Sequence, residues 1–248
     1  MRLLVVGGAG FVGSMVLPHL AERHQIRVFD RRAPAPGGWE SVPGSLDDFD
    51  VLSEAARGCD AMLFMAMNAK EAWGELPTVV SAYDVNVKGL HLAHWAAHEA
   101  GIRRVVVTSS LSVYAPRGAG ERYPTEETPP DGDDFYGFTK RLGEQVSQQA
   151  ARRFGQTVIS LRLCFPWPDL DPAPTAGRPS GGVTGDGVAF RAATFTRARD
   201  VASAILLALE HEHTGWQAFA ISGDPEQRVV PTGKARRVLG WKPTQEER

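Results

Sequence analysis

The chain has 248 residues, of which 43% are hydrophobic and 23% are charged, the balance of an ordinary globular protein with one well-filled core. Its 27 Lys and Arg residues against 29 Asp and Glu residues give a formal net charge of −2, so we expect no nucleic acid and no anionic membrane surface as a partner. The opening apolar run in "MRLLVVGGAG" is too short for a signal peptide, and no stretch approaches the roughly 20 apolar residues that span a bilayer. Cys59 and Cys164 make no metal-ligand spacing and no disulfide framework, which favours a reducing, cytoplasmic location.

Short apolar runs rich in β-branched residues alternate with longer helical patterns along the chain. Strands are predicted at 2–7, 26–30, 61–66, 103–110, 157–163 and 217–222, and helices at 11–23, 48–57, 79–100, 136–154, 200–211 and 233–239. Strands this apolar, with helices between them, predict a parallel sheet that is covered on both faces. The fold class is therefore α/β, with a doubly wound sheet.

One segment interrupts this alternation. Residues 166–187, "PWPDLDPAPTAGRPSGGVTGDG", hold five prolines and five glycines, so we expect a long loop without regular structure. A loop of this length is either a lid beside a site or a plain surface linker, and the sequence leaves both readings open.

A glycine-rich turn follows the first predicted strand. "VVGGAGFVG" places Gly7, Gly10 and Gly13 before a helix, where glycines let backbone N–H groups approach a pyrophosphate at the helix N-terminus. A purely structural turn is the alternative, but the second predicted strand ends in Asp30, which could accept hydrogen bonds from an adenosine ribose. This order predicts dinucleotide binding. Asp30 favours NAD, while Arg31 could pair with the 2′-phosphate of NADP.

Tyr136 and Lys140 stand four residues apart at the start of a predicted helix and therefore project from one face. An ammonium group close to a phenol lowers the pKa of the phenol and suits it to acid–base work. Ser110 and Ser112 lie where the fourth predicted strand leaves the sheet, the edge at which doubly wound folds place ligands. An ordinary helix face and a serine-capped turn are the structural alternatives.

Several segments in chain order resemble the extended short-chain dehydrogenase/reductase family, which includes the NAD-dependent sugar epimerases and dehydratases. They are "GGAGFVG", Asp30, "GSLDD" (44–48), "NVKG" (86–89), "TSSLSVYA" (108–115), "YGFTK" (136–140), "SLRL" (160–163) and "KARRVLGWKP" (234–243). The length and the "GWKP" ending are similar to those of uronate dehydrogenases, short members that oxidise free sugar acids.

This resemblance implies a Rossmann-type dinucleotide-binding domain at 1–163 and a small substrate-binding lobe at 164–248, interleaved so that 200–222 return to the sheet. It implies Ser110, Tyr136 and Lys140 as the catalytic set. The cofactor contacts that it implies are Gly7, Gly10, Phe11, Val12, Gly13, Asp30, Arg31, Leu46, Met65, Ala66, Met67, Thr108, Tyr136, Lys140 and Cys164. The substrate contacts are Ser110, Ser112, Tyr136 and Phe165.

The chain also departs from the family pattern. Dehydratases carry an Asp–Glu pair where this sequence has Leu111 and Ser112, so elimination of water is not expected. Phe165 replaces a polar residue that meets the sugar, and the chain that follows it is short, which favours a small substrate over a sugar nucleotide.

We therefore expect an NAD-dependent oxidoreductase, with NADP as a possible cofactor, that acts on a carbon–oxygen centre of a small sugar-like substrate. An epimerase that keeps NAD bound, and a non-catalytic NAD(P) sensor, remain alternatives. The resemblance implies a homodimer through helices 79–100 and 136–154, with plain core packing as the alternative. His91, His94 and His98 share a helix stripe, but nothing implies an acidic ligand beside them, so no metal is expected.

Overall fold

The computed structural model describes residues 1–68, 73–117, 121–171 and 194–244. Their main feature is a seven-stranded sheet in the order β3-β2-β1-β4-β5-β6-β9, in which all paired neighbours run parallel. Its strands are β1 (Arg2–Val6), β2 (Gln25–Asp30), β3 (Glu40–Pro43), β4 (Ala61–Phe64), β5 (Arg104–Ser110), β6 (Thr157–Leu163) and β9 (Trp216–Ile221). The chain order reverses between β1 and β4, which is the point where doubly wound folds bind ligands. The predicted Rossmann-type fold is confirmed.

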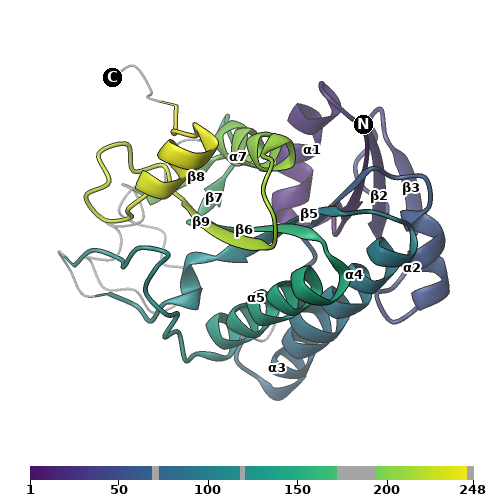
Figure 1. Cartoon of the computed structure of the whole chain (residues 1–248), viewed down its shortest axis with the longest axis horizontal. Coiled ribbons are helices and arrows are strands. Elements are labelled where there is room, and N and C mark those ends of the chain that lie inside the picture. Colours follow the sequence, from purple (N-terminus) through teal and green to yellow (C-terminus); the bar gives the residue numbers. More distant parts are fainter. Residues whose placement is uncertain (69–72, 118–120, 172–193, 245–248) are drawn as a thin grey trace.

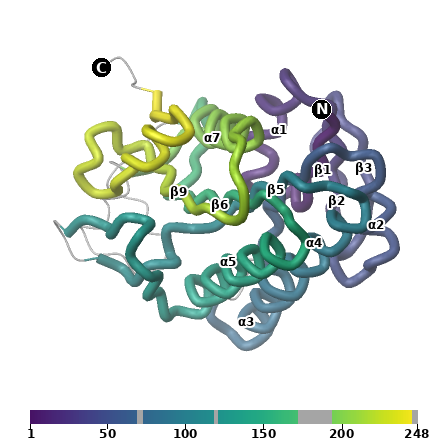
Figure 2. The backbone as a smooth tube through the Cα atoms, viewed as in Figure 1, coloured from purple at the N-terminus to yellow at the C-terminus, as the bar shows by residue number. Residues whose placement is uncertain are grey.

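Helices cover both faces of this sheet (Figure 1). One face carries α1 (Phe11–Ala21) and α7 (Ala198–Glu210), and the other carries α2 (Phe49–Ala56), α4 (Leu90–Glu99) and α5 (Phe135–Phe154). The tube in Figure 2 shows α3 (Leu76–Tyr83) continuing into α4, through a π-helical turn at Asp84–Gly89. Two short helices, Leu111–Val113 and Ala235–Leu239, complete the set of described helices.

The two faces bury separate hydrophobic clusters because successive side chains of a strand point to opposite sides. In β1, Leu3 and Val5 belong to the cluster under α1 and α7, whereas Leu4 and Val6 belong to the cluster under α2 and α4. The strands are apolar on both faces, which is the pattern that predicted a covered parallel sheet.

Two predictions about irregular segments need correction. Pro166–Trp167, predicted as part of a loop, forms the short strand β7, which pairs with β8 (Thr196–Arg197). A proline is tolerated at the first position of an edge strand, where its missing N–H costs no ladder bond. The segment 172–187, with most of the predicted loop, lies outside the described residues. The edge strand β3 was not predicted, because "ESVP" is short, charged and ends in proline.

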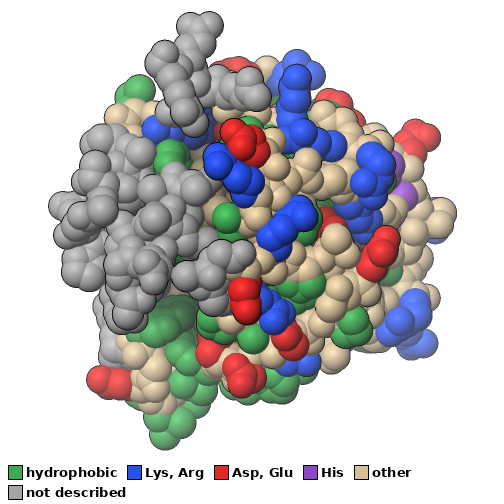
Figure 3. Space-filling view, turned by 90° about the vertical axis from the view of Figure 1, so that its left-hand side faces the viewer, with side chains coloured by type: hydrophobic (Ala, Val, Ile, Leu, Met, Phe, Trp, Pro, Cys, Tyr) green, Lys and Arg blue, Asp and Glu red, His purple; other side chains and the backbone are tan. Residues whose placement is uncertain are grey.

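The C-terminal part of the chain returns to the same layers, since α7 packs on α1 and β9 pairs with β6. The division at residue 163 into two domains remains a prediction. Over the described ranges, no helix combines the length and apolar character needed to cross a membrane. On the face shown in Figure 3, Lys and Arg side chains are interspersed with Asp and Glu side chains, as the near-neutral charge leads one to expect.

Candidate active site

The glycine turn lies at the carboxyl end of β1 and packs tightly against the segment that follows β4. Gly7 has φ +86°, and a Cβ added there would lie 2.4 Å from the backbone N of Ala66. A Cβ on Gly13 would lie 2.3 Å from the Gly8 carbonyl oxygen, so glycine is required at both positions. Gly10 is the N-cap of α1, and no described side chain caps that helix. The start of α1 therefore fits a pyrophosphate, which backbone N–H groups at a helix N-terminus can bind.

Asp30 ties the end of β2 to this turn. Its carboxylate accepts hydrogen bonds from the backbone N of Ala9 at 3.0 Å and of Arg32 at 3.1 Å. The Arg32 guanidinium donates to the Ala9 carbonyl at 3.1 Å, while Arg31 is exposed to solvent. The Asp30 carboxylate and the Arg32 guanidinium thus lie together beside the turn, where an adenosine ribose would meet both charges.

The N-terminus of α5 holds Tyr136 beside the serines that end β5. The Asp134 carboxylate caps α5 by accepting from the backbone N of Tyr136 at 3.0 Å and of Gly137 at 3.1 Å. A Cβ on Gly137 would lie 2.2 Å from the Ser112 carbonyl oxygen, so the first turn of α5 lies directly on the turn after β5. The Ser110 side chain lies near enough to the Tyr136 hydroxyl to act on it, and this interaction works to lower the pKa of the phenol. The structure thus brings the predicted serine and tyrosine together, and their catalytic roles stay predictions.

Lys140 lies one helical turn further along α5, and its Nζ donates to the Thr108 carbonyl at 3.1 Å and lies 5.8 Å from the centroid of the Tyr136 ring. Burial lowers the pKa of Lys140 to about 8, and the Glu144 carboxylate opposes this shift. Burial also raises the pKa of Tyr136 to about 12, more than the interaction with Ser110 lowers it. Desolvation of the phenol thus sets the net upward direction of the Tyr136 shift, and the expected lowering of that pKa by Lys140 stays a prediction.

The remaining predicted cofactor residues lie at the same edge of the sheet, near the end of β5 or on the segments that follow β1, β4 and β6, apart from Leu46, which packs on the cluster under α2 and α4. They are Phe11, Val12, Met65, Ala66, Met67, Thr108 and Cys164. Cys164 is buried, and burial raises the pKa of its thiol to about 12, which suits a small core residue and not a nucleophile.

Phe165 follows Cys164 in a backbone conformation that is unfavourable for a side chain with a Cβ. Its φ is +39°, and 38% of its surface is exposed at the carboxyl end of β6. Strain of this kind costs about 1–3 kcal/mol and is found most often at functional sites. The conformation is consistent with the predicted substrate contact, although that role itself remains a prediction.

Sequence reasoning missed an aromatic side chain, Trp73, that lies beside Tyr136. The Trp73 ring centroid lies 5.4 Å from that of Tyr136 and 4.8 Å from that of Phe135. Trp73 remains 48% exposed, so it adds an apolar wall next to the phenol. Its position in the sequence carried no signal, because the contact joins segments more than sixty residues apart.

The three histidines of α4 are engaged with protein groups. His94 is buried, with Nδ1 2.7 Å from the Gln156 amide oxygen and Nε2 3.2 Å from Ser147 Oγ. His98 stacks on Phe154 at 4.5 Å, and His91 contacts Trp95. In the described part of the chain, no group of three or more His, Cys, Asp or Glu side chains could hold a metal ion.

Comparison with known proteins identifies the family to which the chain belongs. The model of the NAD dependent epimerase/dehydratase family matches residues 3–166, which include the glycine turn, Asp30, Ser110, Tyr136 and Lys140. The L-arabinose 1-dehydrogenase (NAD(P)(+)) of Haloferax volcanii is 30% identical over 65% of this chain and 66% of its own length. The UDP-glucose 4-epimerase of Lactobacillus helveticus is 25% identical over 99% of this chain and 93% of its own length.

Solved structures are similar over nearly the whole fold. A mutant uronate dehydrogenase from Agrobacterium tumefaciens in complex with NAD has a TM-score of 0.78 and 22% identity, over 98% of this chain and 84% of that one. The chain spans only part of the length of several curated relatives that it matches: 66%, 51% and 48% of three of them.

Proposed function

Because the chain belongs to the NAD dependent epimerase/dehydratase family, we propose that it is an NAD(P)-dependent oxidoreductase acting on a carbon–oxygen centre of a small sugar-like substrate. The observation that carries this proposal is the placement of Tyr136, Ser110 and Lys140 at the edge of the sheet that also bears the glycine turn. A sensor without turnover would need the fold and the glycine turn, but it would not need this acid–base set.

The proposed cofactor site consists of the glycine turn, the N-terminus of α1 and Asp30. These groups would hold the pyrophosphate and the adenosine ribose, and Lys140 would hold the nicotinamide ribose. The nicotinamide, when bound, accepts or supplies the hydride of the reaction.

The chain's own residues would move the proton and orient the substrate. Tyr136 would exchange a proton between its Oη and the reacting hydroxyl or carbonyl oxygen, and Ser110 would hydrogen-bond the same oxygen. Lys140 supplies a buried cation near the phenol, which favours the phenolate form at the moment of transfer. Since burial raises the pKa of Tyr136 to about 12, the phenol is a competent acid for reduction, and oxidation should become faster as the pH rises.

A free sugar or sugar acid is the substrate class that we favour. Relatives named for L-arabinose and for uronate match this chain, and the aromatic walls of Trp73 and Phe165 suit the apolar face of a sugar ring. Leu111 and Ser112 do not supply the carboxylates that dehydration needs.

Epimerisation is the second candidate, favoured by the UDP-glucose 4-epimerase that matches 99% of the chain. It would use the same three side chains but would leave no net reduced cofactor.

One assay separates these functions. We would record NADH absorbance with NAD or NADP and a panel of uronic acids, aldoses and polyols, and analyse the products by NMR. Net NADH supports the oxidoreductase, and inversion of a centre without net NADH supports the epimerase. Tight cofactor binding with neither would contradict both and leave a sensor.

A homodimer and a cytoplasmic location also remain proposals. Apolar side chains are exposed on α3, α4 and the start of α5, and a second copy of the chain would cover them; they are Leu76, Val80, Tyr83, Trp95 and Phe138. Sedimentation of the wild type against a Val80→Glu variant tests this, and an unchanged monomeric mass in both would refute the dimer.

A further inference from the structure

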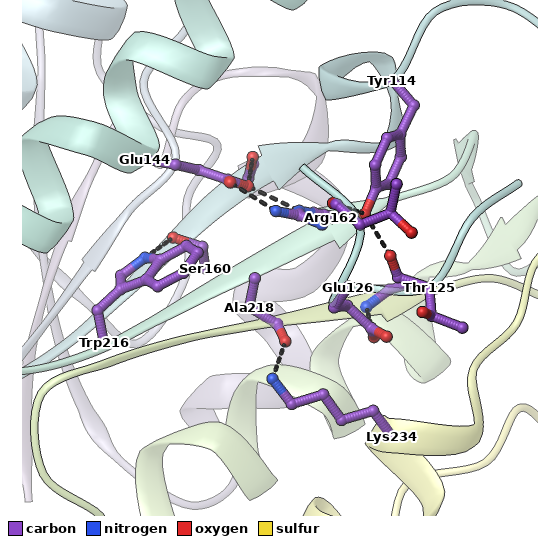
Figure 4. A network of polar contacts seen from close by, with 12 residues as sticks. Tyr114, Thr125, Glu126, Glu144, Ser160, Arg162, Trp216, Ala218 and Lys234 are labelled. Carbon is purple, nitrogen blue, oxygen red and sulfur yellow. Dashed lines mark hydrogen bonds and ion pairs between the residues drawn. The ribbon is translucent and has the colours of Figure 1, made fainter. Parts of the chain in front are cut away.

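A buried ion pair joins α5 to β6 behind the candidate active site (Figure 4). The Arg162 guanidinium donates from Nε and Nη2 to the two carboxylate oxygens of Glu144 at 2.9 and 2.8 Å. The two side chains are only 1% and 3% exposed. Burying two charges costs so much hydration that such a pair is often no more stabilising than apolar side chains of the same size. Stability alone is therefore a poor reason for this pair, and its contacts point to another.

Glu144 connects the pair to the catalytic elements. Its Oε1 also accepts a hydrogen bond from Ser109 Oγ at 2.8 Å, and Ser109 directly precedes Ser110. Glu144 lies one helical turn after Lys140, and both side chains line one small internal cavity together with Thr108. The carboxylate thus holds the end of β5 and lies next to the ammonium group of Lys140.

Arg162 connects the pair to the far side of the serine-bearing turn. Its Nη1 donates to the Tyr114 hydroxyl at 2.5 Å, and that hydroxyl donates to the Thr125 carbonyl at 2.8 Å. Ser110 and Ser112 lie between the two attachment points, Ser109 and Tyr114. The ion pair therefore fixes both ends of the turn that carries the serines.

The other charged groups in this region are bonded to the backbone of β9. Glu126 accepts from the backbone N of Ala220 at 2.7 Å, and Lys234 donates to the Ala218 carbonyl at 2.9 Å, as Figure 4 shows for Lys234. Glu144 is thus the carboxylate that accepts two hydrogen bonds from Arg162 and shares a cavity with Lys140.

We propose that Glu144 and Arg162 are a positioning pair for the reaction: they fix Ser110 relative to Tyr136 and place a negative charge beside the Lys140 ammonium. This inference rests on the proposed function. The second part has an electrostatic reason, because burial lowers the pKa of Lys140 and the charge of Glu144 acts in the opposite direction. The groups around Lys140 are the Tyr136 ring and Glu144 from α5 and the Thr108 carbonyl from β5, and Ser109 and Asn86 also line the cavity.

The first test is Glu144→Met/Arg162→Met, which removes both charges and leaves neither unpaired. The melting temperature should stay within a few degrees of the wild type, while kcat/KM falls about 10- to 100-fold, mainly through kcat. The matched control, His94→Leu/Gln156→Met, removes a buried polar pair from the same side of the sheet and should leave kcat/KM within about twofold. A folded ion-pair variant with the kcat/KM of the wild type would overturn the proposal.

Should that variant not fold, Ser109→Ala serves instead, because it removes one bond to Glu144 and keeps the ion pair. We expect kcat to fall about 3- to 10-fold with unchanged cofactor affinity. Wild-type kcat in this variant would count against the positioning role.

The second test uses Glu144→Gln/Arg162→Met, which keeps an acceptor for Ser109 but removes the charge beside Lys140. Titration of lysine labelled with ¹³C at the ε carbon, followed by NMR, should show the Lys140 midpoint falling by about one pH unit or more. An unchanged midpoint would overturn the electrostatic part. This measurement needs no turnover, so an inactive wild type would count against the proposed function alone, while the titration would still decide the inference.

Discussion

The two faces of the central sheet are built from the same strands but in different ways. On β6, Leu161 points to the side of α1 and α7 and is surrounded by apolar side chains. Its neighbour Arg162 points to the side of α5 and is bonded to Glu144 and Tyr114. The first face is an apolar core, whereas the second combines an apolar core with buried polar networks.

The two faces therefore have different roles: the α1–α7 face mainly stabilises the fold, whereas the α4–α5 face positions the groups of the candidate site. Apolar burial contributes about 25 cal/mol per Å² without constraining direction, so the α1–α7 face can stabilise the sheet without fixing any particular group. Hydrogen bonds and ion pairs are directional, and their net contribution to stability is small. On the α4–α5 face, polar side chains take the place of apolar ones near β5 and β6. Their directional bonds hold the segments that carry Ser110, Tyr136 and Lys140 in place.

The prediction with the largest expected effect tests whether catalysis depends on the side chains of the α5 face. Tyr136→Phe removes the proposed proton donor, so kcat/KM should fall by about 10²- to 10⁴-fold, the usual contribution of general acid–base catalysis. The melting temperature and the cofactor Kd should barely change. Tyr83→Phe, on the exposed side of α3, is the control and should keep full activity. An active Tyr136→Phe enzyme would refute the mechanism.

The next largest expected effect is a loss of stability from a substitution on the α1–α7 face. Leu161→Ala opens a cavity in the cluster under α1 and α7, so the free energy of unfolding should fall by about 2–5 kcal/mol in urea titrations. Activity per folded molecule should be retained, since Leu161 points away from the site. Leu206→Ala, at a partly buried position of the same cluster, should cost less. A large loss of kcat in folded Leu161→Ala would remove the proposed separation between the faces.

The pH dependence of stability should also distinguish the faces. Burial lowers the pKa of His94 to about 4, well below its ordinary value near 6.5. The folded state therefore keeps His94 neutral, and its contribution is present above pH 6.5 and lost as the pH falls through 4. The full loss is about 3 kcal/mol. Unfolding free energies measured between pH 7.5 and 4 should fall less steeply in His94→Leu, and parallel curves would contradict this assignment.

The smallest expected effect is on cofactor binding, at the carboxyl edge of the sheet where Asp30 lies. Asp30→Ala should weaken NAD binding by about tenfold, the value of one hydrogen bond to a charged group, and should weaken NADP binding less. Isothermal titration with both cofactors measures this, with the exposed Asp47→Ala as the control. Greater weakening of NADP than of NAD would reverse the cofactor preference that we propose.

Much of this arrangement is visible in the sequence because it depends on local rules. The alternation of apolar runs and helical patterns predicted the sheet strands except β3, and the Tyr136–Lys140 spacing placed both side chains on one helix face. Glu144 continues that spacing by one more turn and could have been noticed on the same ground. The aromatic contact of Trp73 had no such local signal.

By itself the sequence determined the order of the elements, the glycine turn and the residues that reach the carboxyl edge of the sheet, since periodicity and backbone sterics act over a few residues. Tertiary structure alone decided the pairing of Arg162 with Glu144, the seating of Gly137 on the Ser112 carbonyl and the direction in which the Tyr136 pKa moves. Desolvation is the physical reason, because it depends on which distant segments exclude water from a group, and that is set only when the layers close.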